Sequence, residues 1–272
     1  MKFLVNADEA SVTLGLPFAR AFGASVTLLE PLEEQGQGEA RAKQFRQAGV
    51  ETELVQRKSE WLRALRVVTR AYKYDLVIVG KMWRRGLTGF LFGTVPRPLL
   101  ADIRANLLIV RRRREKIKRL LVAVGAGPTS SQVLRWSGLV TKAFDAQPTL
   151  MHVTERAPTM FTGLESVDET LTRFIRSNSA EARAFQHAAQ TLRVLDIEPE
   201  LKLGRGFVVD EMVTEARSGS YDLIVVGSSF VGPASTRILM QSVTTRLVQR
   251  APCPVMVIRS RPTDEGEGEP GA

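Results

Sequence analysis

The sequence predicts an α/β protein made of two tandem five-stranded parallel-sheet domains, each with helices on both faces of its sheet. The first observation is a repeat, because YDLVIVG at 74–80 returns as YDLIVVG at 221–227. The second is an alternation of short β-rich apolar runs with amphipathic segments, which is typical of parallel strands joined by helical crossovers. The third is that the repeated runs are apolar throughout, as expected of strands covered on both faces.

Further segments repeat in the same order along the two halves of the chain. The matching pairs are 3–8 with 120–125, 24–30 with 146–152, and 106–111 with 254–259. A duplication this long indicates two domains rather than a solenoid of short repeats. We therefore expect one domain at 1–112 and a second at 118–260. The acidic tail at 261–272 has no large apolar residue, which predicts disorder.

The first domain can be divided into elements from its apolar periodicity. Strands are expected near 2–7, 25–30, 51–56, 75–80 and 106–111. Helices are expected near 9–22, 36–48, 59–73 and 95–103. The third helix carries apolar residues at helical spacing that should face the sheet, namely Leu62, Leu65, Val68 and Tyr72.

The second domain differs from the first by an insertion of about twenty-five residues near 155–179. The insertion contains SVDE at 166–169, a capping box that precedes Leu171, Phe174 and Ile175 at helical spacing. This pattern predicts a lengthened or doubled helix. Its apolar residues favour a core position, with a partner-binding surface as the alternative.

Composition excludes several classes of function. The single cysteine, Cys253, rules out an internal disulfide and is expected to be a small buried packing residue, and two histidines leave little for a metal site. The basic run RRRREKIKR at 111–119 carries +6 of the formal charge of +9, so a solvated segment is favoured over a nucleic-acid site. Asp8 and Glu9 interrupt the N-terminal apolar run, and no later run reaches membrane-spanning length. We expect a soluble cytoplasmic protein without membrane insertion.

The order of elements, the glycine-containing loop after the fourth strand and the ending RAPCPVMVIR at 250–259 resemble the universal stress protein family. The resemblance covers nearly the whole chain, twice. It implies a tandem member with a role in the stress response. In one subclass of the family, ATP or AMP binds to a loop G-x2-G-x9-G-[ST], and an aspartate at the end of the first strand contacts the nucleotide.

The resemblance implies a nucleotide site in the first domain. The residues that match it, with one neighbouring cation, are Asp8, Gly80, Lys81, Gly93 and Thr94. Glycines at a strand end let backbone N–H groups approach a phosphate, and a helix N-terminus adds donors. Trp83 replaces the second glycine, while Pro96 and Pro98 remove N–H donors and disfavour helical geometry at Arg97.

The second domain matches the nucleotide motif poorly. Gly227 is kept, but Phe230 and Gln241 replace the later glycines, Ser242 comes one residue late, and Gly125 stands in place of the aspartate. We therefore expect any nucleotide site in the first domain only.

Three functional hypotheses remain. The first is a stress-response protein that binds ATP or AMP in the first domain. The second is a non-nucleotide dimerisation or partner-interaction module on the same fold. The third, an anion or nucleic-acid function for residues 111–119, rests on one segment, and no set of catalytic residues indicates an enzyme. Family members pair through their last strands, which implies a homo-oligomer or an intrachain pseudo-dimer between 105–110 and 253–258.

Overall fold

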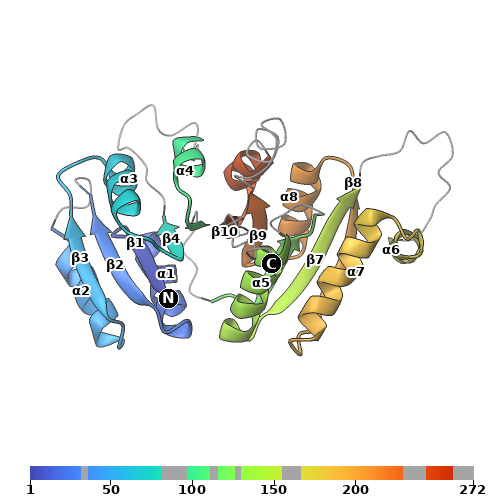
Figure 1. Ribbon diagram of the computed structural model, residues 1–272, viewed down its shortest axis with the longest axis horizontal. Coiled ribbons are helices and arrows are strands. Elements are labelled where there is room, and N and C mark those ends of the chain that lie inside the picture. Colours follow the sequence, from blue (N-terminus) through green and yellow to red (C-terminus); the bar gives the residue numbers. More distant parts are fainter. Residues whose placement is uncertain are drawn as a thin grey trace, which may run out of the picture.

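The computed structural model describes residues 1–31, 36–80, 97–110, 116–125, 130–154, 167–228 and 243–259. Within these residues the strands form one ten-stranded sheet in the order β3-β2-β1-β4-β5-β10-β9-β6-β7-β8 (Figure 1). The first half of the sheet, β1 to β5, precedes the second half, β6 to β10, in sequence. The predicted fold class is confirmed.

The first half alternates strands and helices in the expected order. Its elements are β1 Lys2–Asn6, α1 Glu9–Ala21, β2 Ser25–Glu30, α2 Gly38–Gln47, β3 Thr52–Gln56, α3 Trp61–Ala71, β4 Leu76–Val79, α4 Arg97–Asp102 and β5 Asn106–Ile109. Helix α4 includes Arg97, so the expectation that Pro98 disfavours helical geometry there was wrong. Proline is tolerated in the first turn of a helix, because N–H groups there have no intrahelical partner.

The second half repeats this order with one addition. Its elements are β6 Arg119–Ala123, α5 Ser130–Phe144, β7 Gln147–Thr154, α6 Val167–Arg176, α7 Ala180–Arg193, β8 Glu200–Arg205, α8 Val208–Ser218, β9 Leu223–Ser228 and β10 Val255–Arg259, with a further helical stretch at 243–250 before β10. The insertion supplies α6, so the helix between the second and third strands is doubled, one of the two expected outcomes.

The two halves meet through their last strands. Strands β5 and β10 pair antiparallel, with Val255 opposite Ile109 and Val257 opposite Leu107, whereas the other neighbouring strands pair parallel. Both strands are buried along their whole length. Each would present an open apolar edge if it were alone, so mutual pairing satisfies both backbones. The expected pseudo-dimer within one chain is confirmed.

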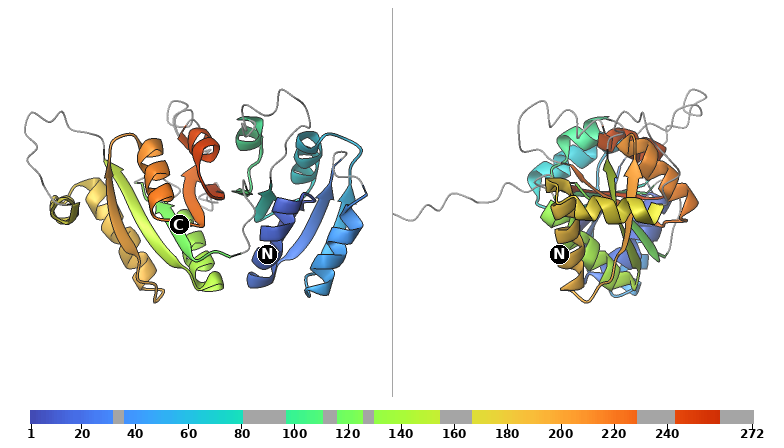
Figure 2. Two further views of the ribbon diagram at one scale, coloured as in Figure 1. Left: turned by 180° about the vertical axis from the view of Figure 1, so that it is seen from behind. Right: turned by 90° about the vertical axis from the view of Figure 1, so that its right-hand side faces the viewer.

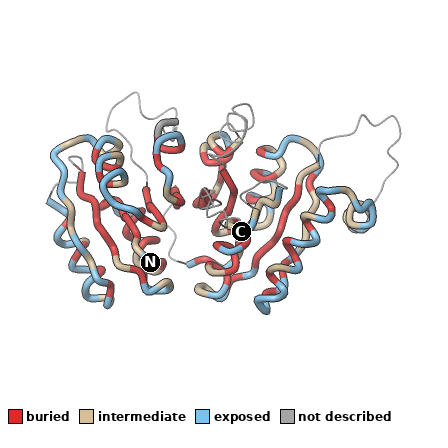
Figure 3. Tube along the Cα trace, viewed as in Figure 1, coloured by how far each residue is buried: buried red, intermediate tan, exposed pale blue. Residues whose placement is uncertain are grey.

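Helices cover both faces of the sheet (Figure 2), and two apolar clusters lie beneath them. One cluster packs α1, α2, α5 and α7 against the sheet, and the other packs α3, α4 and α8 against the opposite face. Each cluster extends through both halves. Figure 3 shows the strands buried and the outward faces of the helices exposed.

Aromatic rings add a second contact between the halves on one face. The Phe18 ring of α1 lies 4.8 Å from the Phe144 ring of α5, centroid to centroid. The Phe22 ring, which follows α1, lies 5.9 Å from the Trp136 ring of α5. The two halves are therefore joined by a helix pair as well as by the sheet.

One expected core residue lies elsewhere. Leu65 and Val68 of α3 are buried as expected, but Tyr72 is 55% exposed. Helix α3 ends at Ala71, and the extended backbone of Tyr72 turns its side chain away from the sheet. The ring instead lies 5.2 Å from the Lys2 ammonium group. Cys253 is buried, as expected.

Among the described residues, no helix combines the length and the apolar character that crossing a membrane requires. The acidic tail at 261–272 lies outside the described residues.

Two buried hydroxyl groups on α5 provide a test of the packing. Ser137 and Thr141 lie one turn apart, and in the described part of the chain neither hydroxyl has a hydrogen-bond partner. The corresponding residues of α1, from the repeat, are Gly15 and Ala19, which carry no hydroxyl. A buried polar group without a partner destabilises the folded state.

We expect Ser137→Ala and Thr141→Val each to raise the free energy of unfolding by about 1 kcal/mol, because each removes an unsatisfied hydroxyl. Urea denaturation monitored by circular dichroism measures the change. Thr191→Val serves as the control, since the Thr191 hydroxyl donates to the His187 carbonyl at 2.8 Å and should give no gain. A lower urea midpoint for both α5 variants would contradict the expectation.

Candidate functional site

The strand order places a topological switch point in each half. In the first half the chain runs outward from β1 to β2 and β3, and then crosses to β4 and β5 on the other side. The crevice at the carboxyl ends of β1 and β4 is the position where open α/β sheets bind ligands. Asp8 follows β1 and Gly80 follows β4, so both predicted residues lie at this crevice.

The Asp8 carboxylate is buried, at 5% exposed, and accepts four hydrogen bonds from three residues. Its Oδ1 accepts the Ser11 N–H at 3.0 Å, which makes Asp8 the N-cap of α1. Its Oδ2 accepts the Asn6 side-chain amide at 2.8 Å, the Ser11 hydroxyl and the Gly80 N–H at 3.2 Å. Asp8 therefore connects the ends of β1 and β4 to the start of α1.

This bonding gives Asp8 a structural role in addition to the nucleotide contact that the family resemblance implies. An ionised carboxylate has about four acceptor positions, and the described residues already supply four donors. A sequence signal for the cap was present, because aspartate is a preferred N-cap residue and a helical segment was expected from residue 9.

Gly80 is required by its closeness to Asp8. A Cβ atom built at Gly80 would lie 1.9 Å from Oδ1 of Asp8, far closer than two nonbonded atoms can approach. The glycine therefore allows the strand end to approach the carboxylate. Lys81, Gly93 and Thr94, as well as Trp83, lie outside the described residues.

We expect Gly80→Ala to lower the free energy of unfolding by about 3 kcal/mol, because the new methyl group must displace Asp8 or the strand end. Chemical denaturation measures the loss. Gly125→Ala is the control, since Gly125 lies at the switch point of the second half, in the place of Asp8, and its Cβ would meet nothing within 4 Å. In an Asp8→Ala background the same Gly80 substitution should cost less, and strict additivity would contradict this explanation.

A second buried carboxylate lies at the carboxyl end of β2. Glu30 is 1% exposed and accepts the N–H groups of Gln37 at 2.9 Å and Gly38 at 2.6 Å. It also accepts the side-chain amide of Gln56 at 2.6 Å. Burial alone raises the pKa of the Glu30 carboxyl, but hydrogen bonds from Gly38, Gln56 and Gln37 outweigh burial and hold the pKa below its usual value.

The lowered pKa of Glu30 predicts a pH-dependent contribution to stability. The contribution is fully present above the unfolded-state value of 4.5 and is lost as the pH falls through the lower folded-state value. We expect Glu30→Gln to destabilise the protein at neutral pH, with the difference from the parent shrinking below about pH 5. Urea denaturation at pH 7, 5 and 3.5 measures both proteins, and a constant difference would contradict the assignment.

The switch point of the second half carries different residues at the ends of its strands. Gly125 takes the place of Asp8, so the carboxylate is missing there. His152 takes the place of Glu30, and its Nδ1–H donates to the Val124 carbonyl at 2.9 Å. The imidazole stacks on Phe174 of α6, with ring centroids 5.2 Å apart and planes 15° apart. The inserted helix therefore packs on the end of β7.

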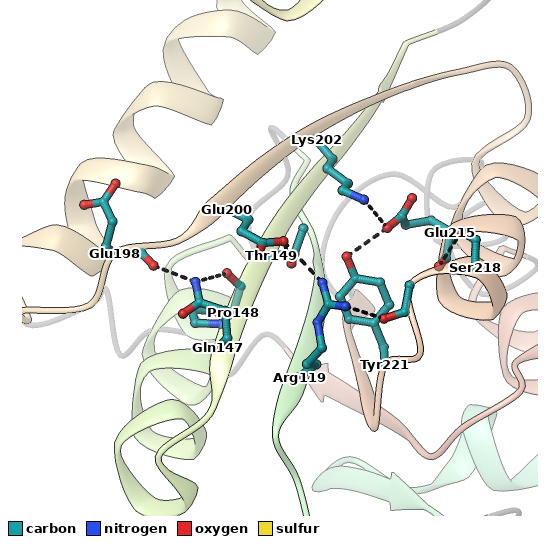
Figure 4. Close-up of polar contacts among 11 residues, drawn as sticks. Arg119, Gln147, Pro148, Thr149, Glu198, Glu200, Lys202, Glu215, Ser218 and Tyr221 are labelled. Carbon is teal, nitrogen blue, oxygen red and sulfur yellow. Dashed lines mark hydrogen bonds and ion pairs between the residues drawn. The ribbon is translucent and has the colours of Figure 1, made fainter. Parts of the chain in front are cut away.

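Figure 4 shows a polar network at the opposite end of the second half, near the amino ends of β6, β7 and β8. The Arg119 guanidinium donates to the Gly219 carbonyl at 2.6 Å and lies over the Tyr221 ring, 4.7 Å from its centroid. The Tyr221 hydroxyl donates to Glu215 at 2.8 Å, and Lys202 pairs with the same oxygen at 2.6 Å.

This network has the properties of a structural cluster. Burial, with the Glu215 carboxylate, raises the pKa of Tyr221 to about 12, so the phenol stays protonated at neutral pH and cannot serve as a base. The corresponding residues in the first half are Val55 and Val68 in place of Lys202 and Glu215. The sequence does not reveal the cluster, because its members are spread over β6, β8, α8 and the connection between α8 and β9. Among the described residues, no group of three or more potential ligands could hold a metal ion.

The fold and its two switch points define a tandem, doubly wound α/β protein. The family model for the universal stress protein family matches residues 10–111 and 116–259. Since these segments cover most of the chain, it belongs to the universal stress protein family, with two copies of the family domain.

Curated relatives support this assignment over half of the chain. A universal stress protein of Methanocaldococcus jannaschii is 23% identical over 152 residues, which cover 56% of this chain and 87% of that protein. A putative universal stress protein of Staphylococcus haemolyticus is 26% identical over 151 residues, covering 54% and 88%.

Solved structures show the same fold over 95% of the chain. A universal stress protein from Archaeoglobus fulgidus has a TM-score of 0.66 at 16% identity, covering 95% of this chain and 96% of that one. The functionally unknown protein PA1789 from Pseudomonas aeruginosa has a TM-score of 0.68 at 13% identity, covering 95% and 92%. At such identities these structures support the fold alone.

Proposed function

We propose that this tandem universal stress protein binds ATP or AMP in its first half only and acts in the stress response by binding rather than by catalysis. The observation that supports the proposal is the contact between the Asp8 carboxylate and the Gly80 N–H at the switch point of the first half. The second half has Gly125 in place of Asp8 and so lacks the carboxylate.

In this proposal the loop after β4 supplies the phosphate contacts. Gly93 would allow close approach of backbone N–H groups, Thr94 would add a hydroxyl donor, and Lys81 would add positive charge. Asp8 would contact the ribose or base while it continues to cap α1.

A partner-interaction module is the second candidate, and the bonding of Asp8 is the observation that favours it. The described residues already supply four donors to this carboxylate. In that case the protein would use the inserted helix α6 as its contact surface and bind no nucleotide.

Calorimetric titration with ATP and AMP distinguishes the two candidates. We expect one site per chain, lost in Gly93→Val and weakened by about 1–3 kcal/mol in Lys81→Ala if that lysine contacts phosphate. Gly227→Val is the control in the second half and should alter stability without changing nucleotide affinity. Two equivalent sites would overturn the assignment to the first half, and absence of binding would favour the interaction module.

The proposal also includes the limits of the two domains and the location of the protein in the cell. We take 1–112 and 118–260 as the two domains, with 261–272 as a tail outside both, and place the protein in the cytoplasm. Pairing of β5 with β10 already covers the edges that separate domains would use for dimerisation. Light scattering of the purified chain measures whether further association occurs.

A further inference from the structure

Arg259, the last residue of β10, links the second half of the chain to helix α4 of the first. Its side chain is buried, with the residue 2% exposed. One guanidinium nitrogen donates to the Ser228 hydroxyl at 2.8 Å, within the second half. The other terminal nitrogen donates to the Leu100 carbonyl of α4 at 2.6 Å. The Arg259 backbone N–H donates to the side chain of Asn106, at the start of β5, at 2.9 Å.

Helix α4 has the features of an element that needs outside support. It spans six residues, far fewer than an isolated helix needs for stability. The last four carbonyls of any helix lack intrahelical partners, and Leu100 is among the last four residues of α4. A positively charged donor at this end satisfies the carbonyl and favours the helix dipole. Arg259 therefore caps α4 from the other half.

The position of α4 gives this cap a consequence for the candidate site. Helix α4 begins at Arg97, directly after the segment 81–96 that contains Lys81, Gly93 and Thr94. A contact that holds α4 in place therefore also holds the point at which residue 96 joins the helix. We propose that Arg259 is a positioning residue, through which the second half holds α4 and thereby the nucleotide-contacting loop of the first half. The ligand part of this inference rests on the proposed nucleotide site.

The energetics of burial support a specific role for this side chain. Burial lowers the pKa of Arg259 to about 10, so the guanidinium remains charged at neutral pH and its desolvation opposes folding. Two of its partners, the Ser228 hydroxyl and the Leu100 carbonyl, lie in different halves of the chain. The same guanidinium therefore joins the end of β9 in the second half to α4 in the first.

Hydrogen exchange tests the positioning claim without any ligand. We expect Arg259→Met, which keeps an unbranched apolar side chain but loses the donors, to raise exchange at the amides of Leu100 to Ile103 about tenfold, with β1 and β2 unchanged. Arg250→Met is the matched control, because Arg250 is half-exposed and pairs with Asp210 within the second half. If Arg259→Met does not fold, Arg259→Lys replaces it, since a lysine cannot reproduce both guanidinium contacts. Unchanged or uniformly raised exchange would overturn the inference.

Titration with AMP tests the link to the loop. In a parent protein that binds AMP, Arg259→Met should weaken the affinity about three- to tenfold while Arg250→Met leaves it unchanged. An unchanged affinity for Arg259→Met would overturn the link. If the parent binds no AMP, the proposed function fails, and the exchange measurement alone decides whether Arg259 positions α4.

Discussion

The antiparallel pairing of β5 with β10 is the interaction on which the rest of the structure depends. It joins two five-stranded sheets into one. The apolar edges of β5 and β10, which would be open in separate halves, cover each other in the middle of the ten-stranded sheet. Both apolar clusters continue across this pair, and the aromatic contact between α1 and α5 forms only because the pair brings those helices together. The stability of each half is therefore coupled to the presence of the other.

Duplication preserved the strand framework while the polar residues at the strand ends diverged. Interior strand positions must remain apolar because helices cover both faces, whereas end positions face water or helix termini and tolerate change. Glu30 holds the N-terminus of α2 by hydrogen bonds, while the corresponding His152 packs against α6 by stacking. Asp8 of the first half likewise corresponds to Gly125 in the second, which has no side chain to form hydrogen bonds. The two halves therefore share a fold but have different polar groups at their strand ends.

The sequence predicted the strands, the helices and the pairing of the halves, because repeats and apolar periodicity report on burial directly. It placed Asp8 and Gly80 at one crevice through the family resemblance. It could not predict that the two would touch, since a contact at 3.2 Å across 72 residues depends on side-chain rotamer and strand register. The exposure of Tyr72 and the reach of Arg259 were missed for the same reason, because both depend on backbone direction at the end of an element.

The bonding of Asp8 also limits how a nucleotide could gain affinity in the first half. Four donors already reach this carboxylate, three of them at Oδ2, so a ligand would have to replace a protein donor. Replacing one hydrogen bond with another yields little net free energy, on the order of 1 kcal/mol or less. Phosphate contacts in the loop between β4 and α4 would then have to supply most of the affinity. The carboxylate would contribute chiefly orientation, by holding the ends of β1 and β4 at a fixed separation while the loop binds.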